Sequence, residues 1–518
     1  MNNLKLRVLM EMRPALEGFA GIPQETRLLF RLLCKLDELA VEGMLLTGHR
    51  ILARGVRPRN LFDKRLTQAR RLNRFSRVVI SMAEQPYRTP LEVVGEYLTR
   101  KVLTSSVTMA TLLGLAKLRL THFDTELFKD FAWRTMFSKT LPAIDFSVVT
   151  AKNYRVCSVP WTVQHLAGLN SLTVHESPRY PRLDTRDVDV FVSQTPYPAS
   201  FPARTQLIVR YHDAIPVLMP HTISDKSLHQ ASHFYALMHN VKSGAYFACV
   251  SESTRKDLLQ MFPEIADRAV TIHNSVSPHY YPEDAPFERV AGIIRARLYA
   301  FDQDAKDLGL APKFLSIREQ ERFYGQHISA KPFQFLLAVS TIEPRKNHAR
   351  LLSAWEVLKA ETDPDLKLVI VGTLGWGYKE LLKSAKTWID RGQLFMLNQV
   401  PAPDLRVLYR HAAATVCPSL GEGFDYSGVE SMRSGGVVIA SDIPVHREVY
   451  DHAAEYFDPY STLSLANSVR KVLYSDAARQ IQGGLRDRGE QVATRYLSES
   501  ILPQWHRFLQ RFMRNNHG

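Results

Sequence analysis

Short apolar, β-branched runs alternate with helical segments along most of this 518-residue chain. In the first half the runs predict strands over residues 4–10, 188–193, 207–211, 246–250 and 270–273. In the second half they predict strands over residues 333–340, 366–371, 394–397, 413–417 and 437–440. This alternation is typical of βαβ units, in which helices cover both faces of a parallel sheet. Because the chain is too long for one ordinary core, we expect two doubly wound α/β domains.

The domain boundaries follow from changes in this pattern. The first domain is expected over residues 1–330 and the second over residues 331–490, followed by a C-terminal helix over residues 491–518. Residues 50–180 are less regular, and we interpret them as a helical insertion in the first domain. A charged, mostly helical stretch over about 282–330 is expected to link the two domains.

Composition narrows the class of protein. The chain is 45% hydrophobic and 23% charged, as in a soluble globular protein. Its four cysteines are scattered without metal-ligand spacing, so we expect reduced thiols in a cytosolic protein. The charged N-terminal segment looks like a first strand and not like a signal peptide. No apolar run reaches the roughly 20 residues that cross a bilayer, so any membrane contact is expected to be peripheral.

Positive charge is concentrated near the start of the irregular region. The formal net charge is +14, and ten Arg and Lys residues lie between Arg50 and Arg77, opposed only by Asp63. Such a cluster attracts anionic lipid headgroups, a phosphorylated lipid-linked acceptor or nucleic acid. A solvated helix face without any partner is an equally good interpretation.

Two carboxylates stand eight positions apart in residues 422–430, Glu-Gly-Phe-Asp-Tyr-Ser-Gly-Val-Glu, ahead of an expected buried strand. Glu422 falls on the loop, where it could bind hydroxyls of a sugar, and Glu430 falls just inside the next helix, where it could accept both ribose hydroxyls of a nucleotide. Backbone N–H groups of the loop could assist, namely those of Gly423, Phe424, Asp425 and Tyr426. Alternatively, Ser427 and Glu430 fit a capping box that needs no ligand.

A basic loop, Glu-Pro-Arg-Lys-Asn-His over residues 343–348, lies between an expected strand and a helix. Arg345 and Lys346 are thereby placed near a helix N-terminus, where free N–H groups and the helix dipole favour an anion. Two cationic side chains in addition make this a diphosphate site, with the acidic groups expected on the opposite side. A basic surface loop without a ligand would have the same local sequence.

In the first half, His212 comes just after the expected strand 207–211, where open α/β sheets bind their ligands. A single histidine at a strand end also often has only a structural role. A second loop, over residues 13–23, follows the first expected strand and contains Gly18 and Gly21. Glycine there lets the backbone approach a phosphate or sugar closely.

Other motifs are less informative. The acidic pairs Asp187/Asp189 and Asp363/Asp365 imitate a metal-binding D-x-D, but the first runs directly into a strand and the second is a turn. The glycines of residues 372–377 have the wrong spacing for a dinucleotide fingerprint, so a dehydrogenase is not supported.

Several of these segments resemble, in the same order, the retaining GT-B glycosyltransferases of family 4. The resemblance is specific over about residues 333–460 and weaker but collinear over about 186–280. It is carried by residues 340–347, 368–372, 417–430, 441–449 and 456–459, together with His212-Asp213 and residues 250–254. It implies a GT-B fold, with two Rossmann-like domains facing across a cleft and a C-terminal helix that returns to the first domain.

The resemblance also implies roles for the matching residues. The donor would be a nucleotide-diphosphate sugar, used as substrate without a further cofactor or a metal. Arg345 and Lys346 would bind the diphosphate, Glu430 the ribose and Glu422 the sugar hydroxyls. His212 would reach the donor sugar from the opposite domain, and Gly21 would line the loop near the phosphates. Transfer would retain the anomeric configuration.

This chain departs from the family pattern in three places. It has Asp425-Tyr426-Ser427 where Gly-Leu-Pro is common, Ser340-Thr341 in place of Gly-Arg, and Ala20-Gly21 in place of paired glycines. The style of its 342–347 and 444–448 segments is similar to mannosyl- and rhamnosyl-type polysaccharide enzymes.

We therefore expect a hexosyltransferase that moves a mannose- or rhamnose-type sugar to a glycan or lipid-linked acceptor. It would act in surface polysaccharide synthesis, such as that of lipopolysaccharide, at the inner face of the cytoplasmic membrane. One alternative is a catalytically silent GT-B binding or scaffold protein. Another is a polyanion-binding protein that uses the Arg50–Arg77 cluster, although nucleic acid is not the expected partner.

Overall fold

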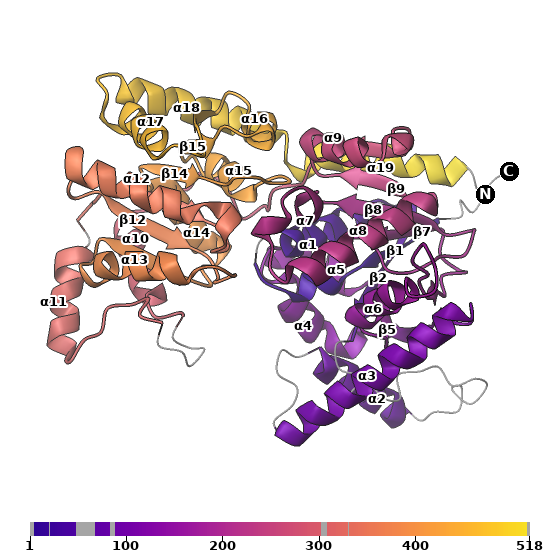
Figure 1. Cartoon of the computed structure of the whole chain (residues 1–518). Coiled ribbons are helices and arrows are strands. Elements are labelled where there is room, and N and C mark those ends of the chain that lie inside the picture. Colours follow the sequence, from indigo (N-terminus) through magenta and orange to yellow (C-terminus); the bar gives the residue numbers. More distant parts are fainter. Residues whose placement is uncertain are drawn as a thin grey trace.

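The computed structural model describes residues 5–19, 21–47, 68–82, 89–301, 308–329 and 331–514, which form two α/β domains (Figure 1). The first domain has an eight-stranded sheet in the order β10-β9-β8-β7-β1-β2-β5-β4, and the second a six-stranded sheet in the order β13-β12-β11-β14-β15-β16. All neighbouring strands of these two sheets run parallel except β4 and β5. The prediction of two doubly wound domains is confirmed.

The strands of the first sheet are β1 (Leu6–Glu11), β2 (Leu39–Leu46), β4 (Leu120–Phe123), β5 (Asn153–Cys157), β7 (Val190–Ser193), β8 (Gln206–Tyr211), β9 (Tyr246–Cys249) and β10 (Ala269–Thr271). The sequence pattern missed β2, β4 and β5. A charged residue interrupts the apolar run in both β2 and β5, but Glu42 of β2 and Arg155 of β5 form an ion pair between the two strands. The charges of Glu42 and Arg155 therefore compensate each other between neighbouring strands of the sheet.

The helices of this domain are α1 (Ile22–Leu33), α2 (Gln68–Ser81), α3 (Pro90–Leu112), α4 (Lys129–Ala132), α5 (Phe146–Thr150), α6 (Trp161–Ser171), α7 (Ile215–Leu218), α8 (Lys226–Lys242) and α9 (Glu252–Met261). The interpretation of residues 50–180 as a helical insertion is wrong in part. Strands β4 and β5 come from this region and extend the main sheet beyond β2. Among the described residues of this region, α2 and α3 stand outside the alternating βα pattern, and Lys117–Leu118 pairs with Arg182–Leu183 in a separate two-stranded sheet.

The second domain contains β11 (Phe335–Val339), α12 (His348–Glu361), β12 (Lys367–Val371), α13 (Lys379–Asp390), β13 (Leu394–Leu397), α14 (Ala402–His411), β14 (Ala414–Cys417), α15 (Tyr426–Arg433), β15 (Val438–Ser441), α16 (Pro444–Tyr450), β16 (Ala454–Phe457), α17 (Thr462–Tyr474) and α18 (Ala478–Thr494). Two helices precede it, α10 (Glu288–Arg297) and α11 (Ile317–His327). Helix α10 packs on α14, so the charged stretch before residue 331 lies against the second domain.

The last helix, α19 (Ser498–Arg514), leaves the second domain and lies on the first, as the yellow ribbon in Figure 1 shows. Phe508 and Phe512 make edge-on ring contacts with Tyr246 of β9. Trp505 is fully buried, and its ring centroid lies 5.4 Å from the guanidinium carbon of Arg210 in β8. The C-terminal helix is thus part of the first domain's packing.

Trp505→Ala should destabilise the protein strongly, because truncating a fully buried tryptophan leaves a cavity worth about 3–5 kcal/mol. Urea denaturation followed by circular dichroism measures the loss. Leu463→Ala is the control, since its side chain is 60% exposed on α17 and should change stability by no more than about 0.5 kcal/mol. Equal effects of the two substitutions would show that α19 does not stabilise the fold.

Candidate active site

A cavity of about 480 Å³ lies between the two domains and is lined by residues of both. The sequence pattern singled out ten residues as a candidate site, and every one lines this cavity. They are Gly21, His212, Arg345, Lys346, Glu422, Gly423, Phe424, Asp425, Tyr426 and Glu430. The structure therefore brings together residues that are up to about 400 positions apart in the chain.

The basic loop forms a single helical turn, Pro344–Lys346, between β11 and α12. Asn347 has a left-handed backbone (φ 57°) that turns the chain into α12. Its side-chain amide donates to the carbonyls of Pro418 (3.1 Å) and Pro459 (3.0 Å), which fixes the turn. Arg345 and Lys346 consequently stand just before the first residue of α12, where the helix N-terminus adds to their positive charge.

Both cations contact Glu422 directly. Arg345 Nη1 lies 2.7 Å from one oxygen of Glu422, and Lys346 Nζ contacts the other. Burial opposes ionisation of Glu422, but Arg345 and Lys346 outweigh it and lower the pKa of this carboxyl. We expected acidic groups opposite the cations. Instead, Glu422 pairs with both cations and Glu343 lies 2.7 Å from Arg345 Nη2, so an incoming anion would have to compete with these carboxylates.

Glu430 projects from the interior of α15 into the same cavity. One carboxylate oxygen accepts from Gln24 Nε2 of the first domain (2.8 Å) and the other from the hydroxyl of Tyr409 (3.1 Å). The capping-box interpretation is wrong, because Asp425 is the residue that caps α15, accepting from the Ser427 N–H at 3.2 Å. Burial raises the pKa of Glu430 to about 7, so this carboxyl holds a proton more readily than usual.

Asp425 is held by the protein on both sides. Its backbone is left-handed (φ 58°), one carboxylate oxygen accepts from the Ser427 hydroxyl (2.7 Å), and the other lies 3.1 Å from Nε2 of His446. His446 is fully buried, with Nδ1 2.9 Å from the carbonyl oxygen of Ser441. His446 therefore positions the loop between Glu422 and α15, a role that the sequence pattern did not reveal.

On the first-domain side, His212 follows β8, and its Nε2 lies 3.4 Å from Oε1 of Gln194. Burial, together with the nearby charge of Arg210, lowers the pKa of His212 to about 3. The imidazole is thus neutral near pH 7 and suited to hydrogen bonding with hydroxyl groups.

Arg210 of β8 anchors the interface between the domains. It is fully buried and donates to Glu25 of α1 (2.9 Å) and to Asn274 (2.7 Å). The second oxygen of Glu25 accepts from the hydroxyl of Tyr426 in the second domain (3.0 Å). Gln24 and Glu25 were not among the predicted site residues, because adjacent polar residues early in a helix carry no signal of a distant partner.

The close contact between the domains at position 423 requires a residue without a side chain, which is Gly423. A Cβ atom at this position would lie 1.8 Å from the carbonyl oxygen of His212, well inside van der Waals contact. Only glycine permits the second-domain loop to pass so close to the first domain. Gly21, on the opposite wall, has a left-handed backbone (φ 64°) immediately before α1, and no other group lies within 4 Å of its notional Cβ.

Glu430 should make stability depend on pH. Because the pKa of this group is about 7 in the folded protein and about 4.5 when unperturbed, its contribution is fully present below pH 4.5 and is lost as pH rises through 7. Glu430→Gln removes the titrating carboxyl. As pH rises from 4.5 to 7, the free energy of unfolding of the variant should therefore fall by about 3 kcal/mol less than that of the wild type. Urea denaturation at a series of pH values measures the difference. Glu380→Gln, on an exposed site of α13, should behave like the wild type.

Gly423→Ala should hold the two domains apart, since the added methyl group collides with the His212 carbonyl. Small-angle X-ray scattering should then give a larger radius of gyration than for the wild type. Gly18→Ala is the matched control, because Gly18 lines the same cavity but has open space around its notional Cβ. An unchanged radius for Gly423→Ala would mean that the loop adjusts locally.

Comparison with known proteins gives a consistent result. Residues 319–484 match the family model of the glycosyl transferases group 1. The chain is 27% identical over 257 residues to the O-antigen chain mannosyltransferase B of Escherichia coli, covering 50% of this chain and 56% of that protein. It is 34% identical over 138 residues to the serotype-specific mannosyltransferase WbdA of Escherichia coli, covering 26% of this chain and 17% of that protein. The chain thus matches little more than half the length of the first relative and a smaller part of the second.

A solved structure extends the similarity to the whole fold. The structure of Anabaena Alr3699/HepE in complex with UDP and glucose superposes with a TM-score of 0.51 at 14% identity, covering 98% of this chain and 99% of that one. At this identity the likeness concerns the fold alone. We conclude that the chain has the GT-B fold and that its residues 319–484 are similar to the glycosyl transferases group 1.

Proposed function

We propose that this protein is a retaining glycosyltransferase that moves a mannose- or rhamnose-type sugar from a nucleotide-diphosphate sugar to a glycan or lipid-linked acceptor. The observation that carries the proposal is the position of Arg345 and Lys346 at the start of α12, on the same cavity as Glu430 and His212. The names of the mannosyltransferase relatives support mannose as the sugar and a role in surface polysaccharide synthesis. We propose that this synthesis takes place at the inner face of the cytoplasmic membrane.

In the proposed donor complex, the diphosphate takes the place of Glu422 on Arg345 and Lys346. Release from the cations then leaves the Glu422 carboxylate free to accept hydrogen bonds from sugar hydroxyls. Ribose hydroxyls would likewise replace Gln24 as partners of Glu430. Each site carboxylate thus exchanges a protein donor for a ligand donor, which costs less than leaving a buried charge unpaired.

In the transfer step, the bond between the anomeric carbon and the diphosphate oxygen breaks, and the acceptor oxygen bonds to the same face of that carbon. The acceptor proton passes to the departing diphosphate oxygen, and the anomeric configuration is retained. The developing negative charge is stabilised by Arg345, Lys346 and the N-terminus of α12. Neutral His212 orients the donor sugar from the first domain. Since these groups supply the positive charge, we expect transfer to persist in the presence of EDTA.

The silent binding protein is the second candidate. It is favoured by the internal pairing of the site, because Glu422 already occupies both cations and Gln24 already occupies Glu430. A sugar-transfer assay distinguishes the enzyme from the silent protein, since a silent protein binds nucleotide sugar without transferring the sugar.

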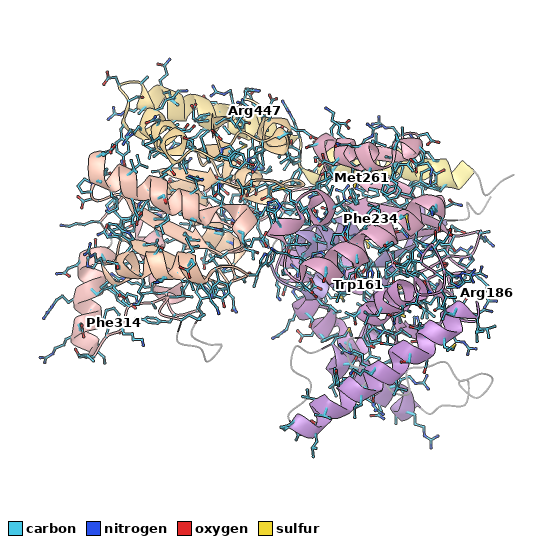
Figure 2. All side chains as sticks on the ribbon, viewed as in Figure 1. Trp161, Arg186, Phe234, Met261, Phe314 and Arg447 are labelled. Carbon is cyan, nitrogen blue, oxygen red and sulfur yellow. The ribbon has the colours of Figure 1, made fainter. Side chains whose placement is uncertain are left out.

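Lys346→Ala and Glu422→Ala should each lower the rate of sugar transfer by about 10²–10³-fold, as expected when one group that stabilises the leaving charge or holds the sugar is removed. The assay uses radiolabelled nucleotide sugar and a lipid-linked or oligosaccharide acceptor, with the product anomer assigned by NMR. Arg447→Ala is the control, because Arg447 is an exposed residue of α16 whose partner is Asp442 on the outer surface (Figure 2). Near-normal transfer by both site variants would mean that the site is wrongly assigned.

The donor can be identified before any acceptor is known. A ligand that binds only the folded protein raises its melting temperature, so thermal-shift measurements with GDP-, UDP- and dTDP-sugars should single out the donor nucleotide.

A further inference from the structure

One face of α3 consists of large apolar side chains that no part of the described chain covers. They are Leu91 (83% exposed), Val94 (54%), Leu98 (56%), Val102 (67%), Met109 (59%) and Leu113 (64%). Intervals of three, four and seven residues place all of them on a single stripe along the helix. We call this set the α3 stripe.

The opposite side of α3 is the one that packs on the protein. Leu103 and Thr111 are buried, α3 packs along α6, and Asn170 of α6 donates to Thr108 at 3.4 Å. In Figure 1 the helix crosses the lower edge of the first domain, and in Figure 2 its outer side chains extend away from the body of the molecule. The α3 stripe therefore faces outward over the length of the helix.

The surroundings of the α3 stripe are basic. Three of the described side chains of α2 are arginines and none is acidic, and residues 89–119 contain four basic and two acidic residues. One of the acidic residues, Glu96, is buried and paired with Arg100. At the margin of the stripe, Lys101 Nζ lies 4.7 Å from the ring centroid of Tyr97. The net charge next to the apolar face is thus positive, although Glu92 at the start of α3 is exposed.

Both helices belong to the same edge of the first domain. Phe75 of α2 makes an edge-on contact with Phe123 of β4, the outermost strand of the sheet, at a centroid distance of 5.4 Å. Helix α3 packs on α6, which follows the neighbouring strand β5. Of the Arg50–Arg77 cluster considered in the sequence, residues 50–67 lie outside the described residues, so only its α2 part enters this argument.

We propose that the α3 stripe is a docking surface for an anionic lipid bilayer. Its apolar side chains enter the boundary between headgroups and acyl chains, while neighbouring Lys and Arg side chains reach the lipid phosphates. The net positive charge beside the stripe favours an anionic lipid surface over a second copy of this basic chain, which would repel it. Within the described residues no helix is long and apolar enough to span a membrane, and α3 accordingly lies on the bilayer surface.

This inference extends the membrane location named in the proposed function, but its test needs neither donor nor acceptor. The full-length protein is mixed with vesicles of phosphatidylcholine, with or without phosphatidylglycerol, and bound protein is measured by flotation. Binding should require phosphatidylglycerol and weaken as salt is raised. The double variant Leu98→Glu/Val102→Glu should bind at least about tenfold more weakly, because two carboxylates on the stripe oppose insertion.

Leu463→Glu is the matched control, since Leu463 is similarly exposed but lies on α17 of the second domain. Circular dichroism and the nucleotide-induced thermal shift should be unchanged in the double variant, because its substitutions lie outside the cavity. Failure of the wild type to bind anionic vesicles, or equal binding by the double variant, would overturn the proposal. So would a wild-type dimer in sedimentation velocity that the double variant separates, since the stripe would then meet a second copy. A failed transfer assay with intact vesicle binding would count against the proposed enzyme and not against this surface.

Discussion

The buried guanidinium of Arg210 is the contact on which the rest of the architecture depends. It joins the sheet of the first domain to Glu25 of α1, and through Glu25 to Tyr426 of the second domain. Its other face lies near Trp505, so the returning C-terminal helix meets the same group. Burying a charge is costly unless it is paired and fully hydrogen-bonded, and here the carboxylate, an amide and backbone carbonyls supply those bonds. One ion pair thus holds three parts of the chain around the cavity.

The charged groups that line the cavity are likewise paired with protein groups. Each buried charge on its walls already has a protein partner: Glu422 has the two cations, and Glu430 has Gln24 and Tyr409. A second carboxylate link lies nearby, where Glu448 of α16 accepts from the N–H groups of Glu252 and Ser253 at the start of α9. The two domains are therefore joined by these polar contacts as well as by apolar ones, such as the ring contact between Tyr280 and Tyr409.

Much of this arrangement could be predicted from the sequence. Five of the six strands of the second sheet are predicted to within two residues, because fully buried parallel strands give continuous apolar runs. The edge strand β16 is not predicted, since it is short, contains Glu455 and is only partly buried. The ten candidate residues of the cavity could be predicted because they follow strand ends or belong to motifs with a fixed spacing, as Glu422 and Glu430 do. The role of each in binding or catalysis stays a prediction.

What the sequence did not reveal depends on partners far away in the chain. Strand β2 gives a weak local signal because Glu42 interrupts its apolar run, and the partner that pairs with this charge, Arg155, lies 113 positions later. Gln24 gives no local sign that it contacts Glu430, 406 positions later. The pairing of His446 with Asp425 is equally invisible, although the positive φ of Asp425 explains why a fixed partner is useful there. The exposure of the α3 stripe cannot be predicted from the sequence, because periodicity indicates an apolar helix face but not whether other parts of the protein pack on it.

The hydrogen bond between Gln24 and Glu430 has a kinetic consequence for the proposed enzyme. Since this bond joins the domains across the cavity, breaking it would let the lobes separate to admit a donor. The same separation would let the spent nucleoside diphosphate leave. The frequency of this opening would then set an upper limit on the number of sugars transferred per second, whatever the speed of the bond-making step.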